Sequence, residues 1–224
     1  MSFYALLPAA GRGARFGALK QYVPLAGRPM LWHAVRAVCM PPIESVFVVL
    51  ARGDREFARH QWSDLGARVE PLYCGGETRR DSVYNALVAT MGLMEADDWV
   101  LVHDAARPCL PPSDLEKLLH EIGDDAVGGI LALPIAETVK KVAEGKVHAT
   151  EDRAQLWLAQ TPQMFRAGLL LRALERAQRA PTDEASAVEQ LGLKPRVVTG
   201  SRENLKVTWP EDLAIAESML KRRA

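Results

Sequence analysis

The chain has 224 residues, of which 48% are hydrophobic and 25% are charged, a composition typical of one globular domain or of one domain with an insertion. Its 28 basic residues balance its 28 acidic residues, and this zero net charge argues against a nucleic-acid or membrane-surface protein, because those partners select basic patches. We expect neither a signal peptide nor a membrane span, because the N-terminus lacks a basic stretch and no apolar run is long enough. The three cysteines are far apart and match no zinc motif, so we expect free thiols and a cytoplasmic location.

Short apolar runs alternate with segments of helical periodicity through most of the chain. The predicted elements, in order, are a strand at 3–7, a helix at 31–38, strands at 46–50 and 69–73, a helix at 81–91, a strand at 99–102, a helix ending near 122, a strand at 129–133, a helix at 169–180, a strand at 196–199 and a helix at 210–220. Ser113 and Glu116 have the spacing of a capping box for the helix that ends near residue 122. The alternation predicts an α/β fold with a Rossmann-like, mostly parallel sheet and helices on both faces. Ligands bind such sheets at the carboxyl ends of the strands, so the loops there are the candidate sites.

One segment interrupts this alternation. Residues 135–157 contain two strand-like runs on either side of a turn at residues 144–146, a pattern typical of a β-hairpin. We interpret the segment as an extended arm inserted into a single domain that spans residues 1–224.

A basic, glycine-rich loop follows the first predicted strand, from Pro8 to Lys20. Three glycines allow backbone N–H groups to approach an anion closely, and three cations add charge: Gly11, Gly13, Gly17, Arg12, Arg15 and Lys20. The glycine spacing is one residue off the dinucleotide-binding fingerprint, which disfavours a dehydrogenase, and Gly17 is followed by Ala18 rather than by the lysine of a P-loop. The loop is therefore predicted to bind a triphosphate, the alternative being a flexible turn with solvated arginines.

Three further polar segments lie near predicted strand ends or before the last helix. Residues 75–82 begin with paired glycines that suit contact with a base or ribose, although the same segment could simply cap a helix. After the strand at 99–102, Asp104 can bind a substrate hydroxyl or Mg²⁺ and Arg107 can bind a phosphate; the alternative is a buried Asp–Arg pair. Lys206 is either a cation of the site or an ordinary surface lysine.

In their order and spacing, these segments resemble the 2-C-methyl-D-erythritol 4-phosphate cytidylyltransferase family of non-mevalonate isoprenoid synthesis. The similarity covers essentially the whole chain and includes residues 134–140, 156–157, 161–163 and 182–186. It implies that CTP and the sugar-alcohol phosphate give the CDP-alcohol and pyrophosphate, with Mg²⁺ as cofactor. The substrate phosphate attacks the α-phosphorus directly, so the protein needs neither a covalent intermediate nor a general base, only positioning and well-placed cations.

The resemblance also implies roles for individual residues. The catalytic set is Arg15 and Lys20 on the α-phosphate, with Arg153 and Lys206 on the attacking phosphate. The nucleotide-binding set is Ala9, Ala10, Gly11, Gly13, Gly75, Gly76, Arg79, Ser82 and Ala105. The alcohol-binding set is Asp104, Arg107, Thr138 and Thr182. No metal ligands are assigned, because Mg²⁺ is expected to be held mainly by the CTP phosphates, with Asp104 as the candidate protein ligand.

Family members form homodimers whose arms interlock, so the resemblance implies that Thr138 and Arg153 serve the neighbouring subunit's site. Two residues depart from the family pattern: Phe16 stands where methionine is usual, and Leu19 stands where proline is frequent. Neither removes a functional group. The chain ends soon after the last predicted helix, so no fused cyclase is expected.

Two other functions compete with this interpretation. A ribitol 5-phosphate cytidylyltransferase would share the nucleotide-binding half of the site and differ only around the alcohol. A non-catalytic nucleotide-binding protein of the same fold would not need Arg15, Lys20 and Lys206 together, so the presence of all three favours an enzyme.

Overall fold

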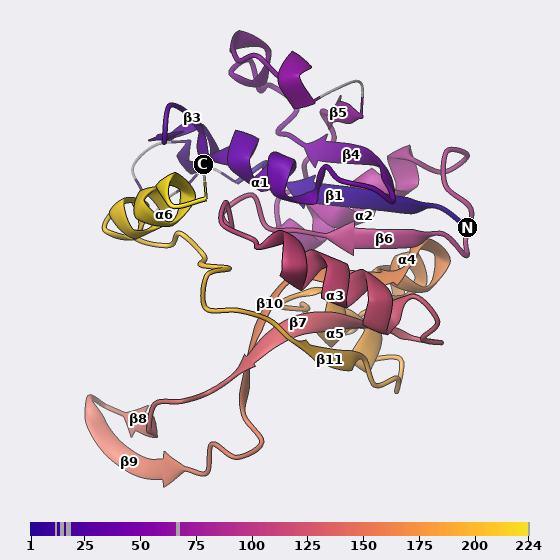
Figure 1. The fold of residues 1–224 in the computed structure, drawn as a ribbon. Helices are drawn as coiled ribbons and strands as arrows, with labels where there is room; N and C mark the ends of the chain where they lie inside the picture. Colours follow the sequence, from indigo (N-terminus) through magenta and orange to yellow (C-terminus); the bar gives the residue numbers. More distant parts are fainter. Residues whose placement is uncertain (12, 14–15, 17–18, 66–67, 224) are drawn as a thin grey trace.

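The computed structural model describes residues 1–11, 13, 16, 19–65 and 68–223. Within these ranges a seven-stranded sheet has the order β11-β7-β10-β6-β1-β4-β5 (Figure 1). The strands are β1 (Phe3–Pro8), β4 (Ile43–Val49), β5 (Val69–Leu72), β6 (Trp99–Val102), β7 (Gly128–Pro134), β10 (Trp157–Arg166) and β11 (Arg196–Thr199). Every strand runs parallel to its neighbours except β10, which is antiparallel to both β6 and β7. The predicted α/β fold with a mostly parallel sheet is confirmed.

Helices cover both faces of the sheet, and the side chains of β1 show how. Ala5 and Leu7 point into one hydrophobic cluster, whereas Leu6 points into the other, as the alternation of a strand requires. The first cluster is closed by α1 (Met30–Val38) and α3 (Pro112–Ile122). The second is closed by α2 (Arg79–Ala89), α4 (Ala167–Arg176) and α5 (Glu184–Glu189). Strands that are buried on both faces therefore read as continuous apolar runs, as β6 does.

Several short elements and the last helix complete the chain. A small two-stranded sheet consists of β2 (Pro24–Leu25) and β3 (Arg28–Pro29), and short 3-10 turns lie at Lys20–Tyr22, Phe57–Arg59 and Ser63–Leu65. Helix α6 (Asp212–Lys221) packs near β2 through a third apolar cluster that contains Leu25, Val207 and Ala216. Throughout the ranges that the structure describes, each helix is too short or too polar to traverse a lipid bilayer.

The hairpin predicted at residues 135–157 is present as β8 (Val139–Ala143) and β9 (Lys146–Glu151). Glu144 and Gly145 form its turn with φ of 49° and 74°, the left-handed conformation that two-residue hairpin turns require. The hairpin projects from the body of the molecule between β7 and β10 (Figure 1). Most of its residues are exposed, so within one chain it has little to pack against.

Some local predictions differ from the structure, and some elements were not predicted. The capping box at Ser113 and Glu116 is wrong: the N-cap is Pro111, Pro112 holds the first helical position, and Ser113 lies inside the helix. The last helix, predicted from residue 210, begins at Asp212, so Pro210 precedes it. Strand β10 and helix α5 were not predicted, although β10 joins the two halves of the sheet.

Candidate active site

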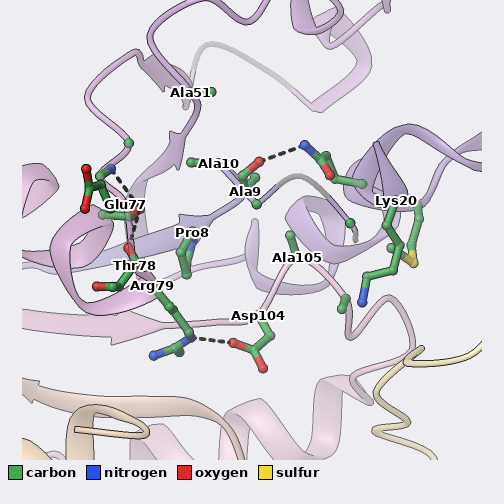
Figure 2. Close-up of a pocket in the computed structure, with 18 of the residues that line it drawn as sticks. Pro8, Ala9, Ala10, Lys20, Ala51, Glu77, Thr78, Arg79, Asp104 and Ala105 are labelled. Carbon is green, nitrogen blue, oxygen red and sulfur yellow. Dashed lines mark hydrogen bonds and ion pairs between the residues drawn. The ribbon is translucent and has the colours of Figure 1, made fainter. Parts of the chain in front are cut away.

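A cavity of about 1030 Å³ lies at the carboxyl ends of β1, β4, β5 and β6, where a parallel sheet is expected to bind its ligand. All nine residues predicted to bind the nucleotide line it: Ala9, Ala10, Gly11, Gly13, Gly75, Gly76, Arg79, Ser82 and Ala105. Lys20, Asp104 and Lys206 line the same cavity. Figure 2 shows Arg79 and Asp104 pointing toward each other, with Lys20 in the same cavity. Segments that are distant in sequence thus meet at one place.

The loops after β1 and β5 meet through small residues, because there is no room for larger ones. A Cβ atom on Gly75 would lie 2.3 Å from the Cβ of Ala10 and 2.8 Å from the carbonyl oxygen of Leu50. The Gly75 N–H also donates a 2.8 Å hydrogen bond to that carbonyl. The backbone at the ends of β1, β4 and β5 is therefore packed closely at this glycine.

The loop before α2 is held by its own side chains. Thr78 is the N-cap and forms a reciprocal capping box with Asp81. The Ser82 hydroxyl accepts a 3.1 Å hydrogen bond from the Gly76 N–H and donates a 3.0 Å bond to the Thr78 carbonyl. The segment thus caps a helix and lines the cavity at once, so the two interpretations of residues 75–82 do not exclude each other.

Asp104 lies at the centre of a cluster of cations. Its Oδ1 accepts a 3.0 Å hydrogen bond from Nε of Arg79, and its Oδ2 lies 2.7 Å from Nζ of Lys206 and 3.9 Å from Nε of Arg107. Burial alone would raise the pKa of Asp104, but Arg79 and Lys206 outweigh it and hold that pKa well below its usual range. Asp104 is therefore a carboxylate near neutral pH.

Arg107 is buried and is not among the residues that line the cavity. Its Nη1 donates a 2.7 Å hydrogen bond to the carbonyl of Asn204, and its Nη2 donates a 3.4 Å bond to the carbonyl of Ala159. The Val207 N–H in turn donates a 2.8 Å bond to the Ala106 carbonyl. These bonds fasten the segment that carries Lys206 beside the loop that carries Asp104.

Lys20 joins a segment near the start of the chain to a segment near its end. Its Nζ donates a 2.9 Å hydrogen bond to the carbonyl of Val207, the residue that follows Lys206. Two of the predicted catalytic cations are thus brought to one cavity from opposite ends of the sequence. Arg15, the third cation predicted here, lies outside the residues that the structure describes, as do Arg12 and Gly17.

The remaining predicted residues lie away from this cavity. Thr138 and Arg153 are on the arm, and Arg153 donates a hydrogen bond to the Ala136 carbonyl next to the base of β8. Thr182 is exposed before α5, where its N–H donates a 3.0 Å hydrogen bond to the Ser186 hydroxyl. None of the three lines the cavity of its own chain.

Two residues that support the Asp104 loop were not assigned a role from the sequence. The Thr161 hydroxyl accepts a 2.9 Å hydrogen bond from the Asp104 N–H and lies 3.1 Å from Nδ1 of His103. The other ring nitrogen of His103 lies 3.0 Å from the Arg107 carbonyl, so His103 bridges the strand β10 and its own loop. Complete burial lowers the pKa of His103 to about 4, and its ring is neutral near pH 7. The sequence contained two signals, a histidine directly before the aspartate and the family-like segment at residues 161–163, and neither indicates that the two residues are in contact.

Among the described residues that line the cavity, the carboxylates are Glu77 and Asp104, and there is no histidine or cysteine. Over the part of the chain that the structure describes, no group of three or more His, Cys, Asp and Glu side chains is arranged to hold a metal ion. Both carboxylate oxygens of Asp104 already contact cations. Mg²⁺ commonly takes most of its ligands from water and substrate phosphates, which is compatible with this arrangement.

Comparison with known proteins supplies an independent test of the resemblance. A family model described as 2-C-methyl-D-erythritol 4-phosphate cytidylyltransferase matches residues 3–222. Proteins of that name from Dechloromonas aromatica and Azoarcus are 54% and 53% identical to this chain over 98% of its length, and the matches cover 98% and 94% of those proteins. The crystal structure of the Francisella tularensis enzyme of that name superposes with a TM-score of 0.83 at 36% identity, covering 98% of this chain and 100% of the other. A crystal structure of a 4-diphosphocytidyl-2C-methyl-D-erythritol synthase superposes with a TM-score of 0.86 at 40% identity, covering 98% of both chains.

Proposed function

The chain belongs to the 2-C-methyl-D-erythritol 4-phosphate cytidylyltransferase family, and from this premise we propose how its cavity carries out the reaction. The protein is a nucleotidyltransferase that converts CTP and 2-C-methyl-D-erythritol 4-phosphate into 4-CDP-2-C-methyl-D-erythritol and pyrophosphate, a step of the non-mevalonate route to isoprenoid precursors. The observation that carries the proposed mechanism is the meeting of Lys20, Asp104 and Lys206 in one glycine-lined cavity.

The attacking group is already an anion, so the barrier comes from bringing negative phosphates together. Lys20, with Arg15, neutralises the charge that builds up on the α-phosphate of CTP, and Lys206 holds the attacking phosphate in line with it. The phosphate oxygen forms a bond to the α-phosphorus while the bond to the pyrophosphate oxygen breaks. This division of labour is supported by the positions of the two lysines in the same cavity and by the bond of Lys20 to the carbonyl of Val207.

Asp104 has two tasks in this mechanism. It pairs with Lys206 at 2.7 Å and so limits the positions that the ammonium group can take. A carboxylate has more acceptor sites than the two cations occupy, so it can also accept a hydrogen bond from a hydroxyl of the alcohol. Thr138, Thr182 and Arg107 complete the proposed alcohol-binding set, Arg107 by fastening the loop that carries Asp104.

The nucleotide occupies the part of the cavity that is walled by alanines and glycines. Their lack of bulk lets backbone N–H and carbonyl groups reach the base edge and the phosphates. Mg²⁺ would be held mainly by the triphosphate, with Asp104 as the candidate protein ligand, and would supply positive charge to the phosphates. The cavity volume of about 1030 Å³ is adequate for a nucleotide and a small sugar-alcohol phosphate.

A homodimer provides the rest of the site. The arm at residues 135–157 exposes large apolar side chains, with Val142 58%, Val147 64% and Trp157 42% accessible in a single chain. Exposed apolar surface of this kind is typical of a protein–protein interface. In the proposed dimer each arm crosses to the partner and presents Thr138 and Arg153 to the partner's cavity.

The proposed location is the cytoplasm, where CTP is available. Cys39, Cys74 and Cys109 are all free cysteines, which suits a reducing compartment.

Substrate selectivity is tested directly by incubating the protein with CTP and Mg²⁺ and either 2-C-methyl-D-erythritol 4-phosphate or ribitol 5-phosphate. Pyrophosphate release is expected with the first alcohol and not with the second, and chelation of the metal should abolish it. Release with ribitol 5-phosphate alone would show that the protein is a ribitol 5-phosphate cytidylyltransferase. No release with either alcohol would favour a non-catalytic nucleotide-binding protein.

A further inference from the structure

The carboxylate of Glu184 is buried and does not line the cavity, but it is bonded to a residue that does. Glu184 is the first residue of α5, and its side chain is 0% accessible. Its two oxygens accept hydrogen bonds of 2.6 Å and 2.9 Å from Nη1 and Nη2 of Arg79, a bidentate pair. Burying a carboxylate is unfavourable unless such a pair compensates the loss of water, so Glu184 and Arg79 form a strong pair.

The pair continues into the site through a chain of charges. The third nitrogen of the same guanidinium, Nε, donates at 3.0 Å to Oδ1 of Asp104. Oδ2 of Asp104 lies 2.7 Å from Nζ of Lys206. Each nitrogen of Arg79 thus contacts a carboxylate, and the order of contacts runs from Glu184 in the interior to Lys206 at the cavity surface.

The backbone around Glu184 is held by the sheet. Gln163 of β10 accepts a 2.9 Å hydrogen bond from the Ala185 N–H and donates a 2.8 Å bond to the Asp183 carboxylate. Asp183 is also the N-cap of α5 and accepts a 2.9 Å bond from the Ser186 N–H. The residues on both sides of Glu184 are therefore fastened to one central strand.

Guanidinium geometry explains why this anchor matters. The guanidinium is planar, so the two bonds to Glu184 fix its orientation and leave the Nε–H directed at Asp104. Without Glu184, Arg79 would keep one carboxylate partner instead of two and could turn its Nη edge to Asp104 or to the cavity. Asp104 would then hold Lys206 in a wider range of positions.

We propose that Glu184 is a positioning residue of the cytidylyltransferase reaction, acting through Arg79 and Asp104 to direct the ammonium group of Lys206 toward the attacking phosphate. Glu184 is not among the residues that line the cavity. The inference rests on the proposed role of Lys206, and it adds a residue from outside the cavity to the functional set.

The first test is kinetic and uses Glu184→Gln, which keeps the shape of the side chain and removes its charge. We expect kcat/KM for 2-C-methyl-D-erythritol 4-phosphate to fall about tenfold, because small displacements of a positioned cation are costly. KM for CTP should change by a smaller factor, because Arg79 also lines the nucleotide part of the cavity. Glu189→Gln, the same substitution at an exposed position of the same helix, is the control and should match the wild type. A folded Glu184→Gln protein with wild-type kinetics would overturn the proposal.

A double-mutant cycle separates positioning from general support of the fold. If Glu184 acts through Arg79, adding Glu184→Gln to Arg79→Lys should lower kcat/KM less than about twofold further. Full multiplication of the two losses would overturn the proposal, since the residues would then act independently. Circular-dichroism melting selects folded variants, and Glu184→Asp, which keeps the charge, replaces Glu184→Gln in both tests if the latter fails to fold. An inactive wild-type protein would instead refute the proposed function.

Discussion

Asp104 is the residue at which the interior of the protein and the surface of the cavity meet. Arg79 approaches one oxygen from the buried side, and Lys206 approaches the other from the accessible side. A carboxylate that could rotate freely would not fix the position of either cation. Because both oxygens are engaged and the Asp104 N–H is bonded to Thr161, the carboxylate has one orientation.

Lys20 is expected to act mainly on the transition state. Lys20→Ala should lower kcat by about 10²–10³ while CTP still binds, because charge on the α-phosphate is greatest during transfer. Steady-state kinetics together with calorimetric titration of CTP would measure the two effects separately. Lys194→Ala, at an exposed position outside the cavity lining, serves as the control. Normal turnover in Lys20→Ala would contradict the role assigned to this lysine.

His103 should make stability depend on pH. In the folded protein its pKa is about 4, whereas an unfolded histidine titrates near its ordinary value of 6.5. Between these two pH values His103 is protonated in the unfolded chain but not in the folded protein, and this protonation favours unfolding. The contribution of neutral His103 to the free energy of unfolding is therefore complete above about pH 6.5 and is lost as the pH falls toward about 4. The loss is on the order of 3 kcal/mol. Urea titrations at pH 7 and pH 4.5 measure how much the free energy of unfolding falls between the two pH values. This fall should be smaller for His103→Gln than for the wild type, and an equal fall would exclude His103 as the cause.

At the scale of elements, the cavity depends on how closely the ends of neighbouring strands approach. The loops after β1 and β5 touch through Ala10 and Gly75, and the Gly75 N–H bonds to the end of β4. Three strands and two loops therefore share one point of contact. A side chain at that point would push a phosphate-binding loop away from its neighbour.

Gly75→Ala should consequently destabilise the protein and weaken CTP binding. The added Cβ would lie 2.3 Å from that of Ala10, and overpacking of this kind typically costs about 1–3 kcal/mol. Gly53→Ala is a matched control, because no heavy atom lies within 4 Å of the Cβ that it would add. Chemical denaturation and CTP titration of both variants would check the expectation. Equal stability of the two variants would contradict it.

Most of the sheet and more than half of the residues that line the cavity could be predicted from the sequence, the first from local signals and the second from local signals together with the family resemblance. Runs such as 46–50 and 99–102 are apolar and β-branched, and glycines mark the loops that approach a ligand. Strand β10 carries no such signal, since Thr161, Pro162 and Gln163 interrupt its apolar pattern. The contacts of Glu184 with Arg79 and of His103 with Thr161 join residues far apart in sequence, and no local pattern specifies them.

For the molecule as a whole, the arm determines whether a single chain or a dimer forms the complete active site. One chain supplies Lys20, Asp104 and Lys206 to its cavity but holds Thr138 and Arg153 on a hairpin that projects away (Figure 1). Under the proposed dimer each site contains residues from two chains. Activity should then depend on protein concentration below the dissociation constant of the dimer.

Subunit mixing tests this arrangement. An Arg153→Ala chain and a Lys20→Ala chain are each expected to be weakly active alone, but a heterodimer would contain one site with both residues intact. Mixed and refolded subunits, purified by two different affinity tags, should recover part of the wild-type activity. Verified heterodimers that stay as inactive as either parent would reject shared sites.

The position of β10 in the sheet has a consequence for synthesis on the ribosome. β6 ends at residue 102, yet its neighbour on one side, β10, begins only at residue 157, after β7 and the whole arm have been made. A nascent chain therefore passes through a stage in which a wholly apolar strand has an unpaired edge. Such edges recruit other strands, so a ribosome stalled within the arm would display a chain prone to aggregation.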